Sequence, residues 1–154
     1  MPRDYVIRQA TDADIDEVIR LRELMFTSLD FPAAEPFWHD AAGRWLREGF
    51  ARDEVAAFVA DLDGRVVGGG VGMLERRMPG PGNGLHGYIM SMATDPDHRG
   101  RGIAGGVVDA LLAWFTDRNV ATVDLHASAQ GDPVYRARGF TESKYLALRW
   151  HPSG

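Results

Sequence analysis

The sequence contains no cysteine, and this absence excludes several kinds of chemistry. Disulfide bonds, a thiol nucleophile and a cysteine-ligated metal are all ruled out. The histidines show no spacing typical of metal ligands, so we expect no metal site. A chain without cysteine also fits the reducing cytoplasm, where we expect this protein to act.

Long apolar runs are missing too, and so is an excess of positive charge. No segment approaches the roughly 20 apolar residues that a membrane-spanning helix needs, and the first residues lack the apolar stretch of a signal peptide. The formal net charge of −5 argues against a general nucleic-acid binder and favours a neutral or cationic small substrate. We therefore expect neither a membrane nor a nucleic acid as a partner.

The composition that remains is that of an ordinary globular domain. Of the 154 residues, 45% are apolar and 25% are charged, and no repeat, low-complexity tract or linker interrupts them. A chain of this length suits one hydrophobic core. We expect one domain over residues 1–154.

Hydrophobic periodicity predicts strands and helices in a mixed order. In chain order, the expected elements are a strand at residues 5–8, helices at 11–29 and 36–46, a hairpin at 55–74, a strand at 85–94, a helix at 102–117, a strand at 121–127, a short helix at 132–138, and one or two strands from Phe140 onward. The apolar face of the first helix has one polar break, at Arg22. This order predicts a mixed α/β or α+β domain whose first half is a largely antiparallel sheet.

The stretch at residues 95–104, between a predicted strand and a predicted helix, is the most informative about function. Gly100 and Gly102 lack a Cβ, so the backbone can adopt unusual φ and ψ angles and approach a ligand closely. The helix that follows presents unpaired N–H groups, and Arg99 and Arg101 add permanent positive charge. These features predict a site for a phosphate or a diphosphate. The alternative is a glycine turn that only begins a helix.

This stretch resembles a motif of a known family. The Gln/Arg-x-x-Gly-x-Gly/Ala pattern of the GNAT superfamily of acyl-CoA-dependent N-acyltransferases is similar to Arg99-Gly100-Arg101-Gly102-Ile103-Ala104. Residues 94–98 resemble that family's lead-in from strand to loop, and residues 125–129 resemble its next strand end. Residues 133–140 are similar to its Tyr-x-x-x-Gly-Phe element. The resemblance spans residues 85–140 with the motifs in the family's order.

The resemblance implies a fold and a reaction. The fold is a mixed, mostly antiparallel sheet flanked by helices. The hydrophobic periodicity described above predicts about four of these helices. The reaction moves an acetyl or other acyl group from acetyl-CoA to the amine of a small molecule or peptide, by direct attack in a ternary complex. The resemblance also raises the expectation of a homodimer.

Site residues follow from the same resemblance. Backbone amides are expected to hold the coenzyme A pyrophosphate at Arg99, Gly100, Arg101, Gly102, Ile103 and Ala104. The strand end is expected to pair with pantetheine at Met92, Ala93 and Thr94. Ser128 is expected to contact pantetheine, or else to cap the last helix. Tyr135 is expected to protonate the leaving thiolate, which suits a phenol.

The general base is missing from its expected place. Many relatives carry a glutamate on the strand before the pyrophosphate loop, where this sequence has Met90. Substitutes within reach of the predicted strands are Glu75, His86, Asp124 and His126. Ordered water is the other route by which the amine could lose its proton.

The acceptor pocket is expected on the early helices and loops. The pocket candidates are Met25, Phe26, Phe31, Phe37, Trp38 and Trp45, although aromatic residues at helical spacing are more often core residues. Phe31 and Phe37, near a helix break, are the preferred pocket candidates. The sequence does not reveal which amine is the acceptor or how long the acyl group is.

Two other functions fit part of the pattern. Gly100, Gly102 and Gly105 satisfy Gly-x-Gly-x-x-Gly, and Asp124 follows about 20 residues later, as in an NAD(P)-dependent oxidoreductase. Against this, residues 95–99 separate the strand from the glycines, and too little chain follows for a doubly wound sheet. The other alternative is a non-catalytic acyl-CoA-binding or sensing module, which the missing glutamate favours.

Overall fold

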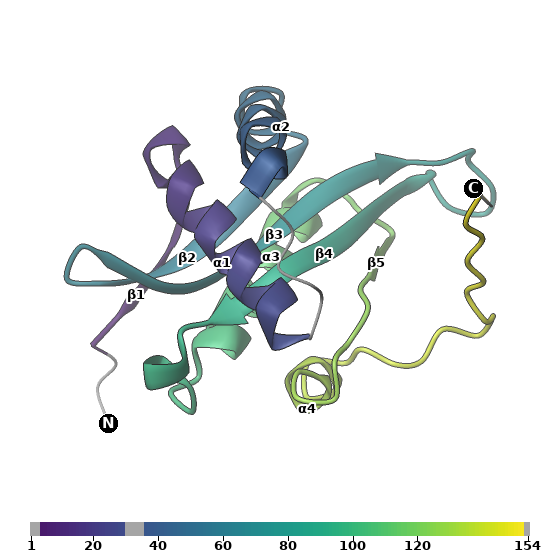
Figure 1. Ribbon diagram of the computed structural model, residues 1–154. Coiled ribbons are helices and arrows are strands. Elements are labelled where there is room, and N and C mark those ends of the chain that lie inside the picture. The colour runs from purple at the N-terminus through teal and green to yellow at the C-terminus, as the bar shows by residue number, and fades with distance from the viewer. Residues whose placement is uncertain (1–3, 30–35, 153–154) are drawn as a thin grey trace.

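A five-stranded sheet forms the centre of the protein, in a computed structural model that describes residues 4–29 and 36–152 (Figure 1). Its strands, in both spatial and chain order, are β1 (Val6–Gln9), β2 (Val55–Leu62), β3 (Arg65–Arg76), β4 (Leu85–Thr94) and β5 (Thr122–Asp124). Neighbouring strands are antiparallel except β4 and β5, which are parallel. The mostly antiparallel sheet expected from the sequence is confirmed.

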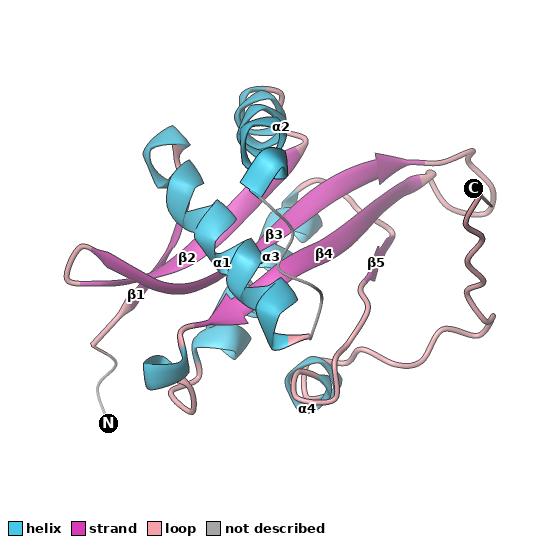
Figure 2. Cartoon of the chain, in the orientation of Figure 1, coloured by secondary structure: helices cyan, strands magenta, loops and turns pink. Residues whose placement is uncertain are grey.

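Helices cover both faces of this sheet, as Figure 2 shows. They are α1 (Ile15–Ser28), α2 (His39–Ala51), α3 (Ile103–Asp117) and α4 (Asp132–Arg136), with short 3-10 turns at Asp12–Asp14, Pro36–Trp38 and Pro96–His98. α1 and α2 pack on one face and α3 packs on the other. The structure therefore confirms the mixed α/β fold.

Strand β2 shows why both faces are covered. Val55, Ala57 and Val59 are buried beneath α1 and α2, whereas Ala56 and Ala60 are buried beneath α3. Side chains of a strand alternate between the two faces of its sheet, so a run of apolar residues supplies both cores at once.

Glycines on the face of the sheet toward α3 leave the room that the side chains of this helix fill. A Cβ at Gly72 or Gly87 would lie 2.8 or 2.6 Å from the ring of Phe115, which is buried. A Cβ at Gly68 would lie 2.8 Å from Ile103, the first residue of α3, and Gly68 pairs with Thr94 at the end of β4. The start of α3 is thereby held beside the end of β4.

The segment after α4 differs from the sequence prediction. No strand occurs in described residues 141–152, so the expected strand from Phe140 onward is wrong. The apolar side chains Tyr145, Leu146, Leu148 and Trp150 are 75–86% exposed. Their weak alternation gives no buried face, because no helix packs over the segment, which leads away from α4 (Figure 1).

Candidate functional site

The glycine-rich loop after β4 adopts the backbone geometry of an anion site. Gly100 and Gly102 have φ values of 79° and 81°, in the left-handed region that favours glycine. Gly102 is the residue before α3, and its carbonyl accepts a hydrogen bond from Gly106 N–H at 3.0 Å. None of the backbone amides of residues 100–105 donates to another residue of the described chain. The loop therefore presents a row of unpaired donors at a helix N-terminus.

The two arginines of the loop are turned toward protein acceptors. Arg99 Nε donates to the carbonyl of Thr94 at 3.3 Å, and Arg101 Nη1 lies 3.6 Å from Asp4 Oδ2. Both arginine side chains stay at least partly exposed. Their charge adds to that of the helix dipole at this end of the sheet.

The second edge of β4 is open next to this loop. β4 pairs with β3 along its length to Thr94, but β5 pairs with it only through His86–Tyr88. The edge of β4 from Ile89 to Thr94 has no neighbouring strand in the described chain, and Figure 1 shows β5 leading away toward α4. Ser91 interrupts the strand with a φ of 57°, where the β3–β4 register shifts. An extended ligand could hydrogen-bond to this edge as a strand does.

Tyr135 and Ser128 follow β5 on the far side of that opening. The Tyr135 ring is 8% exposed and lies edge-on to Phe140, with ring centres 5.9 Å apart. Its hydroxyl makes no hydrogen bond to another described residue, and burial raises its pKa. Ser128 Oγ accepts the N–H of Gly131 at 3.1 Å, but Gly131 is itself the N-cap of α4 and no described side chain caps this helix, so the capping role offered as the alternative for Ser128 is wrong.

The four candidate bases come together at the opposite end of β4. Glu75 Oε2 and Asp124 Oδ2 lie 2.8 and 3.9 Å from the same guanidinium, that of Arg77. His86 is the cross-strand partner of Glu75. His126 Nδ1 is hydrogen-bonded to the Tyr88 hydroxyl, whose pKa is raised by burial. Tyr88 could not be singled out from the sequence, because its contact with His126 depends on the parallel register of β4 and β5.

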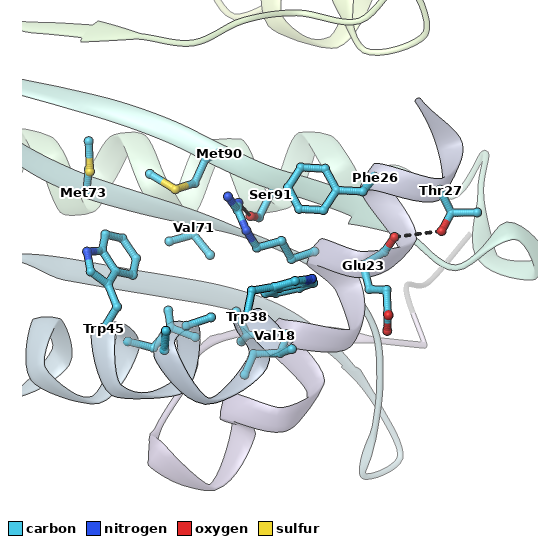
Figure 3. A pocket seen from close by; sticks show the side chains of 15 residues that line it. Val18, Glu23, Phe26, Thr27, Trp38, Trp45, Val71, Met73, Met90 and Ser91 are labelled. Atoms are coloured by element: carbon cyan, nitrogen blue, oxygen red, sulfur yellow. Dashed lines mark hydrogen bonds between the residues drawn. The ribbon is translucent and has the colours of Figure 1, made fainter. Parts of the chain in front are cut away.

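A large apolar cavity lies between α1, α2 and the sheet (Figure 3). Its volume is about 830 Å³, and its walls include Phe26, Trp38, Trp45, Val71, Met73 and Met90. Figure 3 shows Trp45 near Met73 at one end of the cavity, and Phe26 and Trp38 near Ser91 at the other. Met90, at the position where the resemblance led us to expect a glutamate, is thus a cavity wall.

The aromatic residues near the helix break are placed differently from the prediction. Phe37 is 80% exposed and does not line the cavity, so its selection as a pocket residue is wrong. Phe31 lies outside the described residues. Phe26, Trp38 and Trp45, for which core packing was the preferred interpretation, line the cavity. Trp38 also packs against the core on this face of the sheet, so it has both roles.

The sequence matches the model of the acetyltransferase (GNAT) family over residues 16–140. The chain belongs to this family. The match includes β4, the glycine-rich loop, α3 and α4, which are the elements that build the loop and the open edge described above. The resemblance identified in the sequence is therefore confirmed.

Individual relatives agree with the family assignment. An uncharacterized N-acetyltransferase of Methanocaldococcus jannaschii is 24% identical over 94% of this chain, which spans only 64% of that relative's length. An N-alpha-acetyltransferase of Sulfurisphaera tokodaii is 26% identical over 94% of this chain and 84% of its own. The crystal structure of a predicted acetyltransferase with acetyl-CoA, from Clostridium acetobutylicum, superposes with a TM-score of 0.85 at 26% identity and covers 94% of this chain and 96% of its own.

The GNAT fold also accounts for the glycine pattern that resembled a dinucleotide site. The sheet is mostly antiparallel, not the doubly wound parallel sheet that a dinucleotide fold requires. Gly105 has a packing role, because a Cβ there would lie 2.2 Å from Arg138 Nη2. Asp124 lies 3.9 Å from Arg77 near the opposite end of β4 from the glycines. The oxidoreductase alternative thus has no support in this GNAT chain.

Within residues 4–29 and 36–152, no three His, Asp or Glu side chains are grouped so that they could hold a metal ion. In the same ranges, no helix combines the length and the apolar character needed to span a bilayer.

Proposed function

We propose that this protein is an N-acetyltransferase that moves the acetyl group of acetyl-CoA to the amine of a small molecule or peptide. The observation that carries the proposal is one juxtaposition. Unpaired amides at residues 100–105 lie just beyond a β4 edge that has no neighbouring strand, so a diphosphate and an extended arm can bind end to end.

In this proposal the backbone holds the donor. The unpaired amides of Gly100, Arg101, Gly102, Ile103 and Ala104 bind the pyrophosphate, whereas the amide of Arg99 donates to the Pro96 carbonyl at 3.5 Å. The edge at Met92, Ala93 and Thr94 pairs with pantetheine, and one of its amides polarises the thioester carbonyl. Ser128 accepts from Gly131 through its oxygen, so its hydroxyl hydrogen is free to contact pantetheine.

The chemistry is direct transfer. The neutral amine attacks the thioester carbon, and the tetrahedral oxyanion is stabilised by the backbone amide. The C–S bond then breaks, coenzyme A leaves as a thiolate, and Tyr135 donates a proton to its sulfur. Because burial raises the pKa of Tyr135, the phenol stays protonated at neutral pH and can serve as this acid.

The proton lost by the amine needs an acceptor that Met90 does not provide. Glu75 Oε2 and Asp124 Oδ2 lie 2.8 and 3.9 Å from the guanidinium of Arg77, so both carboxylates already face a protein cation. His126 is held through Nδ1 by Tyr88, which leaves Nε2 for a proton. Tyr88 is the cross-strand neighbour of the cavity residue Met73, so we propose His126 as the base, acting directly or through water.

Binding and turnover test the proposal separately. Acetyl-CoA is expected to raise the melting temperature, whereas NADPH is not, and calorimetry is expected to detect coenzyme A binding that Gly102→Glu abolishes. Absence of binding heat, or an unaffected Gly102→Glu variant, would overturn the donor site. Release of coenzyme A thiol across an amine panel tests the transferase. Tight binding without turnover of any amine would instead support an acyl-CoA sensor.

Three further expectations stay predictions. One domain over residues 1–154, a homodimer and a cytoplasmic location each await direct measurement. Acetyl as opposed to a longer acyl group is proposed because the C. acetobutylicum relative was crystallised with acetyl-CoA.

A further inference from the structure

Arg22 of α1 lines the apolar cavity as a half-buried cation. Its Nη1 donates to Ser91 Oγ at 2.5 Å, and its guanidinium carbon lies 4.8 Å from the centre of the Phe26 ring. In the part of the chain that the structure describes, no carboxylate pairs with Arg22. Desolvation therefore lowers its pKa, with no nearby negative charge to oppose the shift.

Other arginines near α1 do have carboxylate partners. Arg8 binds both carboxylate oxygens of Asp14 at 2.8 and 2.9 Å, and Arg20 binds both of Asp95 at 2.7 and 3.2 Å. Burying a guanidinium without an anion is costly, because the charge loses its water and gains nothing equivalent. Arg22 therefore has a capacity for an anion that its protein surroundings do not satisfy.

Among the described residues that line the cavity, only Glu23 carries a carboxylate, and it does not neutralise Arg22. Glu23 follows Arg22 on α1, but its side chain is 50% exposed, and Oε1 lies 3.7 Å from His39 Nε2. Figure 3 shows Glu23 directed away from Ser91, where Arg22 binds. The positive charge thus faces a cavity whose other walls are mostly apolar.

The position of this charge matters for the reaction. Ser91, which holds Arg22, directly precedes the β4 segment Met92–Thr94 that the proposed function assigns to the thioester arm. An anion bound to Arg22 would therefore lie beside the proposed reacting carbonyl. In an α-amino acid, the amine and the carboxylate are bonded to the same carbon. When Arg22 binds the carboxylate, the amine of the amino acid would therefore lie beside the thioester carbonyl.

The rest of the cavity suits a bulky apolar group. Phe26, Trp38, Trp45 and Met73 form its walls, and a volume of about 830 Å³ exceeds the needs of an amine and a carboxylate alone. We infer that the acceptor is an α-amino acid with a large apolar side chain, whose carboxylate is bound by Arg22. This inference rests on the proposed function and specifies its acceptor. The product is the N-acetylated amino acid, with one proton passing from the amine and one to the thiolate.

Matched acceptors test the inference. We would measure thiol release from acetyl-CoA with L-phenylalanine, L-tryptophan, L-leucine and L-methionine, each beside its carboxamide, which keeps the amine and side chain but lacks the carboxylate. A hydrogen-bonded charge predicts a kcat/KM roughly 10- to 100-fold higher for at least one acid than for its amide. Equal rates for acids and amides, or faster amides throughout, would overturn the inference while leaving the transferase intact.

Variants at Arg22 test whether a preference for the amino acid over its carboxamide depends on this residue. Arg22→Met is expected to remove the preference for the acid while acetyl-CoA affinity and melting temperature stay near wild type. Arg22→Lys is expected to retain part of it, and Arg44→Met, an exposed arginine on α2, to retain it fully. A preference that survives in a folded Arg22→Met variant would contradict the assignment.

A binding measurement covers the case in which a variant is inactive or the transferase proposal fails. Trp38 and Trp45 line the cavity, so L-phenylalanine, L-leucine and L-methionine, which barely fluoresce, are expected to change the tryptophan emission of the wild type more than their carboxamides do. An acid and its amide with the same dissociation constant would contradict the inference, whatever the turnover assays show. Loss of acetyl-CoA binding in the wild type would instead count against the proposed function.

Discussion

The hydroxyl of Tyr5 donates a hydrogen bond to the backbone carbonyl of Arg101 at 2.9 Å. Tyr5 precedes β1 and is buried with the α3-facing core, whereas Arg101 stands between the two left-handed glycines of the loop. A contact across 96 positions thus fixes the peptide whose neighbours present the unpaired amides. This contact therefore holds the loop in the form that the proposed pyrophosphate site requires.

Tyr5→Phe is expected to weaken coenzyme A binding. Removing one hydrogen bond worth about 1 kcal/mol frees the loop and raises the dissociation constant about fivefold. Calorimetry with coenzyme A measures this, and Tyr145→Phe, at a tyrosine that is 75% exposed, is the matched control. Equal affinities of wild type and Tyr5→Phe would show that the loop keeps its form without this bond.

Tyr135→Phe is expected to reduce kcat about a hundredfold, in the range of lost general acids, with little change in acetyl-CoA affinity. The acid must be protonated to work, and burial raises its pKa, so wild-type activity is expected to fall only above about pH 10. The variant should lack that alkaline limb. An unchanged kcat would remove Tyr135 from the acid role.

His126→Asn is expected to lower kcat most near neutral pH. The deficit should shrink as pH rises toward about 9–10, because more of the amine is then already neutral and needs no base. Tyr88→Phe, which removes the hydroxyl that holds His126, is expected to give a smaller loss of the same shape. A deficit that stays constant with pH would point to a structural role for His126.

Asp14→Asn is expected to destabilise the fold by about 1–2 kcal/mol at pH 7. The Arg8 guanidinium lowers the pKa of Asp14 from 3.8 to about 2. A carboxyl with a depressed folded-state pKa contributes stability that is present above its unfolded pKa and is lost as pH falls through its folded one. The difference between variant and wild type should therefore shrink between about pH 4 and pH 2 in urea unfolding. The exposed Asp117→Asn is the control, and a pH-independent difference would exclude the Arg8 pairing as its cause.

Strong periodicity made some elements predictable from sequence. The bounds of β4 are those expected, and α3 differs by one residue at its start, because both segments are long and flanked by Pro and Gly. β5 is shorter than expected, because only three of its residues pair with β4 before the two strands separate. The absent C-terminal strand had only weak alternation to support it, and alternation without a neighbouring strand edge does not form a sheet.

The candidate site also has features that the sequence predicts and features that it does not. Glycines with positive φ at residues 100 and 102 could be predicted, since the motif is local. The cavity could not, because it depends on how two helices lie over a sheet. In the sequence, Arg22 appears only as a polar break in an apolar helical face. Its surroundings could not be predicted, because Ser91, which accepts its hydrogen bond, lies on β4. Phe26, whose ring it contacts, is one helical turn away on α1.

The unpaired edge of β4 from Ile89 onward has a practical consequence for handling the protein. A sheet edge with free N–H and C=O groups is a template for strands of other molecules. The pantetheine arm of acetyl-CoA, if bound along this edge, would block the pairing of other strands with it. Purified stocks should therefore stay clear longer during warm storage when acetyl-CoA is added, by an amount greater than the gain in melting temperature alone accounts for.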